Sequence, residues 1–310
     1  MKSKVVGVAL LACCAWANAA SFSYTGPAVP IPDGADLSGN NPGAAVSAPI
    51  TVSGLTQPIA KVTMSIDGQT CTATAGATTV GIDHTFVNDL RISLRSPAGT
   101  TVVVIQNTDG SGNNLCQVVL DDDSSGPSIQ TVVTASAPFT GNYTPNAPLS
   151  AFMGEDANGV WALQAQDFFS QDTGSIRAWT INITEMQAQA ITFTSAAPVG
   201  AVVGGSPYAV TATGGGSNNP VVFSIDSSAS AVCSIAGSNV TFLAPGTCVI
   251  NANQAGNDEY SAAPQVQQTF QVAAVPVPKP ITAVPTLGEW SLILLAAIAG
   301  ALGLRAQRRS

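Results

Sequence analysis

Short runs of alternating apolar and polar residues, separated by Gly, Asn, Asp and Pro, recur along most of the chain. A period of two is typical of strands with one buried face. It predicts strands at 50–55, 60–67, 89–97, 101–106, 161–167 and 176–184. This pattern favours β-sandwich architecture over helices.

One strand is especially legible, in the segment DLRISLRSP. Leu90, Ile92 and Leu94 should face one side of a sheet, with charged and hydroxyl side chains between them facing the other. Pro97 and Gly99 then supply turn chemistry, because proline fixes φ and glycine accepts a positive φ. We therefore expect a hairpin on the face of a sandwich.

A second group of short strands, with different spacing, occupies residues 190–273. It contains ITFTS, YAVTATG, VVFSID, NVTF and VQQTFQV, which suits a seven-strand sandwich. A length of 310 residues accommodates two modest domains with processing segments. We expect a first domain at 45–186, a Gly/Pro/Asn-rich linker at 20–44 and a Pro-rich stalk at 274–283.

Composition limits the classes of partner. The chain is 45% hydrophobic and only 9% charged. Between its basic ends lie five basic and 18 acidic residues, a net charge of −13. Such a surface repels phosphate backbones, so we expect no nucleic-acid partner.

The N-terminal residues 1–19 read as a secretory signal peptide, with a basic start, a short apolar run and a small-residue end. Ala17 and Ala19 fit an A-x-A cleavage site, so the mature chain would begin at Ala20. The alternative is lipidation at Cys13, because LLAC approximates a bacterial lipobox.

Four cysteines remain once the signal peptide is removed. An even count in an exported chain predicts disulfides. Each expected domain holds two cysteines, which pairs Cys71 with Cys116 and Cys233 with Cys248. Zinc is the competing interpretation, but the chain has no C-x-x-C and a single histidine.

The C-terminal segment 291–304 is uncharged and ends in an arginine cluster. As a helix it would cover roughly 21 Å, short of the ~30 Å hydrocarbon core of a bilayer. Trp290 at one interface and snorkelling arginines at the other would close part of this gap. We expect a transmembrane helix with its arginines in the cytoplasm.

The order of parts in this tail resembles the IPTL-type sorting signals of Gram-negative bacteria. Its motif residues are Val284, Pro285, Thr286, Leu287, Glu289 and Trp290, with Val284 in place of the usual isoleucine. The resemblance implies that a membrane-embedded enzyme of the envelope sorting machinery reads residues 284–310. The protein would then be delivered to the cell surface or released. An ordinary tail anchor is the alternative.

Three segments of the first domain resemble the P domain, also called the Homo B domain. They are HTFVNDLRISLRSPAGT, VVLDDDS and LSAFMGEDANGVWALQAQDFFSQDTGSIRAWTINI, and the resemblance covers about 140 residues. It implies a jelly-roll β-sandwich of the kind that follows and stabilises subtilisin-like proteases. In the second domain, the Gly-Thr-Cys248 strand and Tyr260-Ser-Ala-Ala resemble bacterial Ig-like repeats, which act as spacers or ligand-presenting units.

His84 is the only histidine, and Asp83 precedes it. A Ser-His-Asp triad needs an aspartate that orients the imidazole, yet neighbours on a strand point to opposite faces. The segment before the P domain is too short for a protease domain, and no Gly-Thr-Ser nucleophile segment occurs. We therefore expect a structural histidine, no catalytic residue and no enzymatic activity.

Asp121, Asp122 and Asp123 form the densest run of carboxylates. Hard oxygen ligands suit calcium, so these residues are a candidate structural calcium site, with Asp167 and Asp172 as further ligands. The alternative is a solvated acidic loop, since EF-hand spacing is absent. We expect no other cofactor.

Paired carboxylates also raise glycoside hydrolysis, for which Glu155, Asp156 and Glu185 are available. Such pairs occur in almost any acidic chain, and roles in turns and strand ends are favoured. Trp161 and Trp179 are expected in the core rather than on a sugar-binding platform.

Arg177 is expected to pair with a carboxylate rather than to bind a ligand. Together these features predict a non-catalytic exported cell-surface protein, adhesive, structural or binding a surface protein or glycan through its loops. The alternative is an accessory protein that stabilises or recruits a separately encoded subtilisin-like protease. A secreted hydrolase is a remote third.

Overall fold

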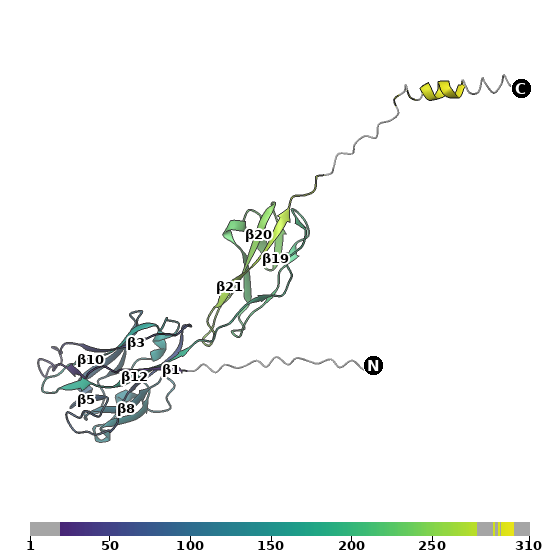
Figure 1. Ribbon diagram of the computed structural model, residues 1–310. Helices are drawn as coiled ribbons and strands as arrows, with labels where there is room; N and C mark the ends of the chain where they lie inside the picture. The colour runs from purple at the N-terminus through teal and green to yellow at the C-terminus, as the bar shows by residue number, and fades with distance from the viewer. Residues whose placement is uncertain (1–18, 278–287, 289–290, 292, 301–310) are drawn as a thin grey trace, which may run out of the picture.

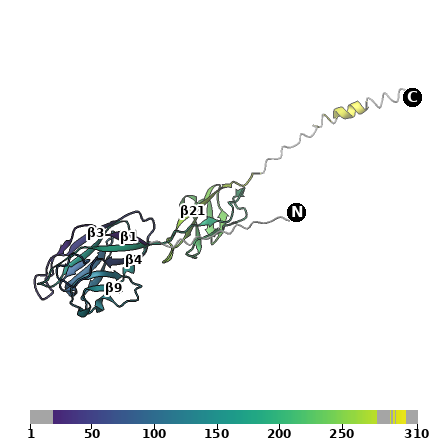
Figure 2. The same cartoon turned by 60° about the horizontal axis from the view of Figure 1, so that its bottom comes forward.

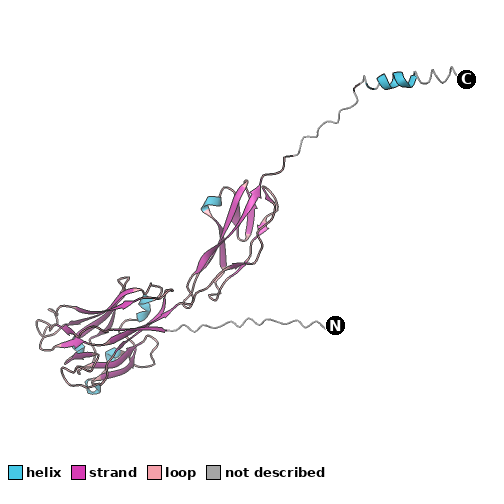
Figure 3. Cartoon of the chain, in the orientation of Figure 1, coloured by secondary structure: helices cyan, strands magenta, loops and turns pink. Residues whose placement is uncertain are grey.

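The structure, a computed structural model, describes residues 19–277, 288, 291 and 293–300. Two β-rich bodies follow one another along the chain, as Figure 1 shows and the turned view of Figure 2 repeats. Figure 3 shows that strands dominate both bodies and that helix is confined to short turns there. The fold is all-β, as the sequence predicts. The expected sorting motif and residues 1–18 of the expected signal peptide lie outside the described residues, whereas Ala19 begins a strand.

The first body, residues 19–185, is a β-sandwich of two sheets. Its strands are β1 (Ala19–Ser23), β2 (Val29–Ile31), β3 (Val46–Val52), β4 (Ile59–Ile66), β5 (Ile82–His84), β6 (Leu90–Arg95), β7 (Thr101–Gln106), β8 (Leu115–Leu120), β9 (Phe139–Tyr143), β10 (Gly159–Asp167), β11 (Gly174–Ile176) and β12 (Trp179–Glu185). Short 3-10 turns are η1 (Val87–Asp89), η2 (Ile129–Thr131), η3 (Thr134–Ser136) and η4 (Leu149–Phe152). One sheet runs β1-β12-β4-β8-β5-β11-β2, with β9 beside β8, and the other runs β3-β10-β6-β7.

The core of this sandwich lies between the two sheets. Trp161 of β10 and Trp179 of β12 are both fully buried, so the predicted core role of these tryptophans is confirmed. The Trp161 ring meets Phe152 edge-on at 5.0 Å between centroids, and its indole N–H donates to the Ala157 carbonyl at 2.8 Å. Leu90, Ile92 and Leu94 of β6, which the alternation predicts on one face, are buried in this core.

The first three strands pair in a nested order with the last three of the sandwich. β1 pairs with β12, β2 with β11 and β3 with β10, all antiparallel. The prediction of a linker over 20–44 is therefore wrong for β1 and β2. Phe22 and Val29 pack against the core, but each strand carries so few apolar residues between glycines and prolines that the sequence pattern hides it.

The second body, residues 192–273, packs three small sheets. Its strands are β13 (Thr192–Phe193), β14 (Ala201–Val202), β15 (Tyr208–Ala209), β16 (Ala212–Thr213), β17 (Val221–Ile225), β18 (Cys233–Ala236), β19 (Asn239–Phe242), β20 (Gly246–Gln254) and β21 (Ala263–Ala273), with a 3-10 turn η5 (Ser227–Ala229). The sheets are β14-β21-β20-β17, β15-β19-β18 and β13-β16. This body has nine strands instead of the seven predicted, and several of them are only two residues long. Its Ig-like character stays a prediction.

The C-terminal segment is helical at residues 291 and 293–300. Among the residues that the structure describes, no helix has both the length and the apolar composition needed to cross a membrane. The rest of the expected transmembrane helix, including the arginine cluster, lies outside those residues.

Candidate functional site

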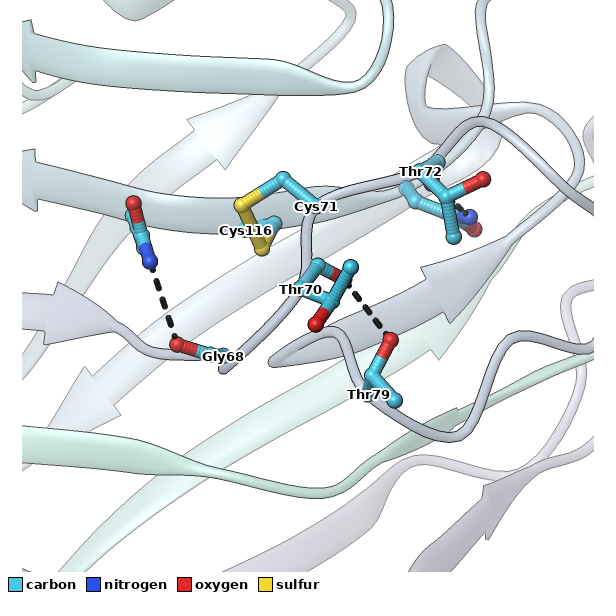
Figure 4. Close-up of a disulfide and its surroundings, with 8 residues drawn as sticks. Gly68, Thr70, Cys71, Thr72, Thr79 and Cys116 are labelled. Carbon is cyan, nitrogen blue, oxygen red and sulfur yellow. Dashed lines mark hydrogen bonds between the residues drawn. A yellow bond between two sulfur atoms is a disulfide. The ribbon is translucent and has the colours of Figure 1, made fainter.

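Both predicted disulfides are present. Cys71–Cys116 joins the loop after β4 to β8, across a separation of 45 residues. Figure 4 shows this loop held further by Thr79, whose hydroxyl donates to the Thr70 carbonyl at 2.7 Å. Gly68 is required beside it, because a Cβ there would lie 2.6 Å from the Cys116 sulfur.

The second disulfide, Cys233–Cys248, joins β18 to β20 across 15 residues. Both cysteines are buried in the core of the second body. Each body therefore carries its own crosslink, which suits an oxidising compartment outside the cytoplasm.

His84 is fully buried at the end of β5. Its Nε2 lies 3.1 Å from Oδ2 of Asp167, a carboxylate at the end of β10 that is also fully buried. Nδ1 lies 2.9 Å from the Phe86 carbonyl oxygen, so both ring nitrogens are engaged inside the sandwich. The imidazole is enclosed and has no path to a substrate, which is the arrangement of a structural residue.

Asp83 does not orient His84. Its carboxylate instead accepts a hydrogen bond from Nε of Arg177 at 2.7 Å, the carboxylate pairing expected for that arginine. The Thr85 hydroxyl donates to Asp172 in the loop between β10 and β11. Gly174 lets β11 approach β5, since a Cβ there would lie 2.0 Å from the Asp83 carbonyl oxygen. These motif residues tie the loops at one end of the sandwich together.

A surface hollow of about 450 Å³ opens at this same end. Three segments of the chain line the hollow, and one of them includes η1. The lining residues are Leu37, Phe86, Asn88, Asp89, Phe169, Ser170, Gln171 and Asp172. Two of its large apolar side chains are exposed, Leu37 at 65% and Phe86 at 44%. Its two carboxylates belong to Asp89 and Asp172.

The electrostatics of the hollow centre on Asp89. Burial raises the pKa of its carboxyl to about 6, with further raising by the charges of Asp167 and Asp172, against a lowering by His84. Asp89 therefore holds a proton in the folded protein at a pH where it has lost it in the unfolded chain. This contribution to stability is present in acid and is lost as pH rises through about 6.

Replacing Asp89 by asparagine should stabilise the first sandwich at neutral pH. Because Asp89 is only partly buried and solvent screens its charge, we expect a gain of about 1 kcal/mol in unfolding free energy near pH 7. The gain should vanish near pH 4. Urea unfolding across this pH range measures it, with the exposed Asp109→Asn as the matched control. A gain that persists unchanged in acid would contradict the electrostatic cause.

The three consecutive aspartates, where the sequence predicts a calcium site, each have a partner within the chain. Asp121 and Asp123 both contact Lys61, at 2.8 and 2.7 Å, so one ammonium group offsets half of their negative charge. Asp122 accepts hydrogen bonds from the main-chain N–H groups of Leu149 and Ser150, each at 2.8 Å, at the start of η4. Within the described ranges, no group of three His, Cys, Asp or Glu side chains is placed to hold a metal.

The other proposed calcium ligands lie elsewhere, since Asp167 contacts His84 and Asp172 contacts Thr85. The carboxylates considered for glycoside hydrolysis also accept hydrogen bonds from other residues of the same sandwich. Glu155 accepts from the Thr100 hydroxyl, Asp156 from the Asn158 main-chain N–H at 2.9 Å, and Glu185 from the main chain at 56–57. These contacts match the turn and strand-end roles that the sequence favours.

The alternating pattern of the sequence does not reveal the hollow. Leu37 lies in the segment that the sequence predicts to be a linker, and Phe86 and Phe169 are apolar residues beside acidic ones in loops, which carry no periodic signal. A usable sign was present, because Phe168 and Phe169 interrupt an otherwise polar loop between two aspartates. Exposed apolar residues in loops point to binding more than to packing.

Most of the first sandwich matches a known protein family. Residues 75–183 match the family described as proprotein convertase P-domain. The first sandwich carries a P-domain. The match begins in the Cys71–Cys116 loop and ends in β12, so the whole buried His84 network lies inside it. A P-domain is a non-catalytic domain, consistent with the enclosed histidine.

Two relatives match part of this chain. Leupeptin-inactivating enzyme 1 of Streptomyces exfoliatus is 32% identical over 163 residues, which are 50% of this chain and 28% of that enzyme. The calcium-dependent protease of Trichormus variabilis is 30% identical over 107 residues, 34% of this chain and 13% of that protease. The chain therefore spans less than a third of the length of either relative.

Residues 282–309 match the IPTL-CTERM motif. This confirms the sorting signal predicted from the sequence, and it makes the chain an exported protein of the cell envelope. The two disulfides fit that extracellular location.

Proposed function

We propose that this protein is a non-catalytic cell-surface protein whose P-domain binds a partner outside the cell. The observation that carries the proposal is the joining of a P-domain, with its only histidine sealed in the core, to a C-terminal sorting signal. A sandwich of this kind is a rigid support, and its loops are the parts free to contact a partner.

A second function has its own support. Relatives that match part of this chain are named as a leupeptin-inactivating enzyme and as calcium-dependent proteases, and the matched segment is a minor part of each. The chain would then be an accessory that stabilises or recruits a separately encoded serine protease at the surface.

Replacing Pro285, Thr286 and Leu287 together by alanine should block sorting. In the native host, the unaltered protein should lose the segment after Trp290 and leave the inner-membrane fraction. The triple variant should keep its tail and stay in the membrane, because the processing enzyme reads the motif. Peptide mass mapping of the C-terminus in envelope fractions measures this, and Pro280→Ala in the stalk is the control. Equal processing of the triple variant would refute surface sorting through this motif.

A fluorophosphonate probe separates the two functions. After crosslinking on intact cells, the leading proposal expects no label on this chain and none on the protein crosslinked to it. The accessory function expects a labelled partner and an unlabelled chain. Label on this chain itself would overturn both, because it would reveal an activated serine.

A further inference from the structure

The surface hollow beside η1 combines exposed apolar side chains with carboxylates. Leu37 and Phe86 leave much of their apolar surface in water, and Phe169 lines the same hollow. The carboxylates of Asp89 and Asp172 stand among them. Exposed apolar surface next to uncompensated charge suits a ligand that is apolar along its length and charged at its end.

The charge in this hollow is one-sided. The charged groups that face Asp89 are Asp167, Asp172 and His84, and the histidine is already engaged with Asp167 inside the sandwich. Asp33 adds a further carboxylate at the rim, where it accepts the main-chain N–H of Gln171 at 3.0 Å. The region therefore carries more negative charge than its own side chains neutralise.

A neutral acceptor beside the hollow is also unused. The side-chain oxygen of Asn88, a residue that lines the hollow, is buried and has no hydrogen-bond partner among the described residues. A buried acceptor without a donor costs free energy, so this part of the surface is not fully satisfied by its own contacts.

We propose that this hollow binds an arginine or lysine side chain of a partner protein. The aliphatic stem would pack against Leu37, and the cation would lie near Phe86 and Phe169. Carboxylates accept charge-assisted hydrogen bonds from such groups, and the planar fork of arginine suits them best. A volume of about 450 Å³ accommodates one long side chain with part of its backbone.

The chemistry favours a partner over a second copy of this chain. The residues between its basic ends carry five basic against 18 acidic side chains, so two copies repel each other. The inference deepens the proposed partner binding by naming the chemistry that the partner presents. It is tested by ligand titration alone, so it can fail while surface sorting holds.

The test is a titration of the full chain, in detergent micelles, with its ten phenylalanines labelled with ¹⁵N. N-acetyl-arginine methylamide should shift the amide signals of Phe86 and Phe169 and saturate in the low millimolar range, as expected for one side chain at about 1 mM affinity. The citrulline analogue, which keeps the shape and lacks the charge, should not. Binding should strengthen from about pH 5 to about pH 8, as Asp89 loses its proton.

Asp89→Asn and Asp172→Asn should each weaken arginine binding by about tenfold, equivalent to about 1.4 kcal/mol, while Asp109→Asn leaves it unchanged. The remaining phenylalanine signals report that each variant is folded. Equal binding of the citrulline analogue, or unchanged binding by both hollow variants, would overturn the proposal. Saturation by spermidine well below the arginine concentration would do so too, since it would assign the hollow to free polyamines.

Discussion

Replacing His84 by alanine is expected to lower the unfolding free energy of the first sandwich by about 3–5 kcal/mol. The change leaves the Asp167 carboxylate fully buried without the imidazole that faces it at 3.1 Å. Removing one partner of a buried pair lowers the stability far more than replacing both partners. The charge that remains is buried without a partner and without water around it. Such a loss is a large share of the stability of a domain of this size.

Urea unfolding followed by tryptophan fluorescence measures this effect in the right part of the molecule. Residues 190–273 contain no tryptophan, whereas Trp161 and Trp179 lie in the first core. Lys61→Ala is the matched control, since it breaks a pair with Asp121 and Asp123 that is partly exposed and worth about 0–1 kcal/mol. If the His84 variant lost no more stability than the Lys61 variant, the buried pair would not support the fold.

Changing Cys71 and Cys116 together to alanine should destabilise the same sandwich by about 4 kcal/mol. The disulfide closes a loop of 45 residues, and the chain-entropy account assigns about that much to a loop of this length. The disulfide also fastens the segment between β4 and β5 to β8 (Figure 4). Without the disulfide, this segment should become more susceptible to proteolysis. The measurement is again urea unfolding by tryptophan fluorescence, under oxidising conditions.

The second disulfide provides the control. Changing Cys233 and Cys248 to alanine removes a crosslink over 15 residues, worth about 3 kcal/mol, from a body without tryptophan. This loss should be seen by circular dichroism and should leave the tryptophan transition in place. If both double variants moved the tryptophan transition equally, the two sandwiches would unfold as one unit and their stabilities would not be separable.

Strong alternation made much of the first sandwich predictable. The run of Leu90, Ile92 and Leu94 gave β6 its buried face, and 101–106 coincides with β7. The weak strands were not predictable. β2 has three residues, and it is held by pairing with β11 far along the chain, which local patterns do not reveal.

The residues of the candidate site were likewise predictable only where a local pattern specified their partners. One cysteine pair per domain identified both disulfides, since pairing within a compact unit leaves no alternative there. The Asp121–Asp123 run suggested a cation, but the cation that meets Asp121 and Asp123 is Lys61, from β4. Likewise the partner of His84 is Asp167 rather than its sequence neighbour Asp83. The pairing of β5 with β11 brings His84 close to the end of β10, where Asp167 lies.

The nested pairing of the first sandwich sets the order of events during folding. The chain is synthesised from its N-terminal end, and Ala20 of β1 pairs with Ile183 near the other end of the sandwich. None of β1, β2 and β3 has its partner strand until nearly the whole sandwich has been synthesised, so closure must wait on contacts that are distant in sequence and slow to form. Until then its unpaired edges are open to aggregation.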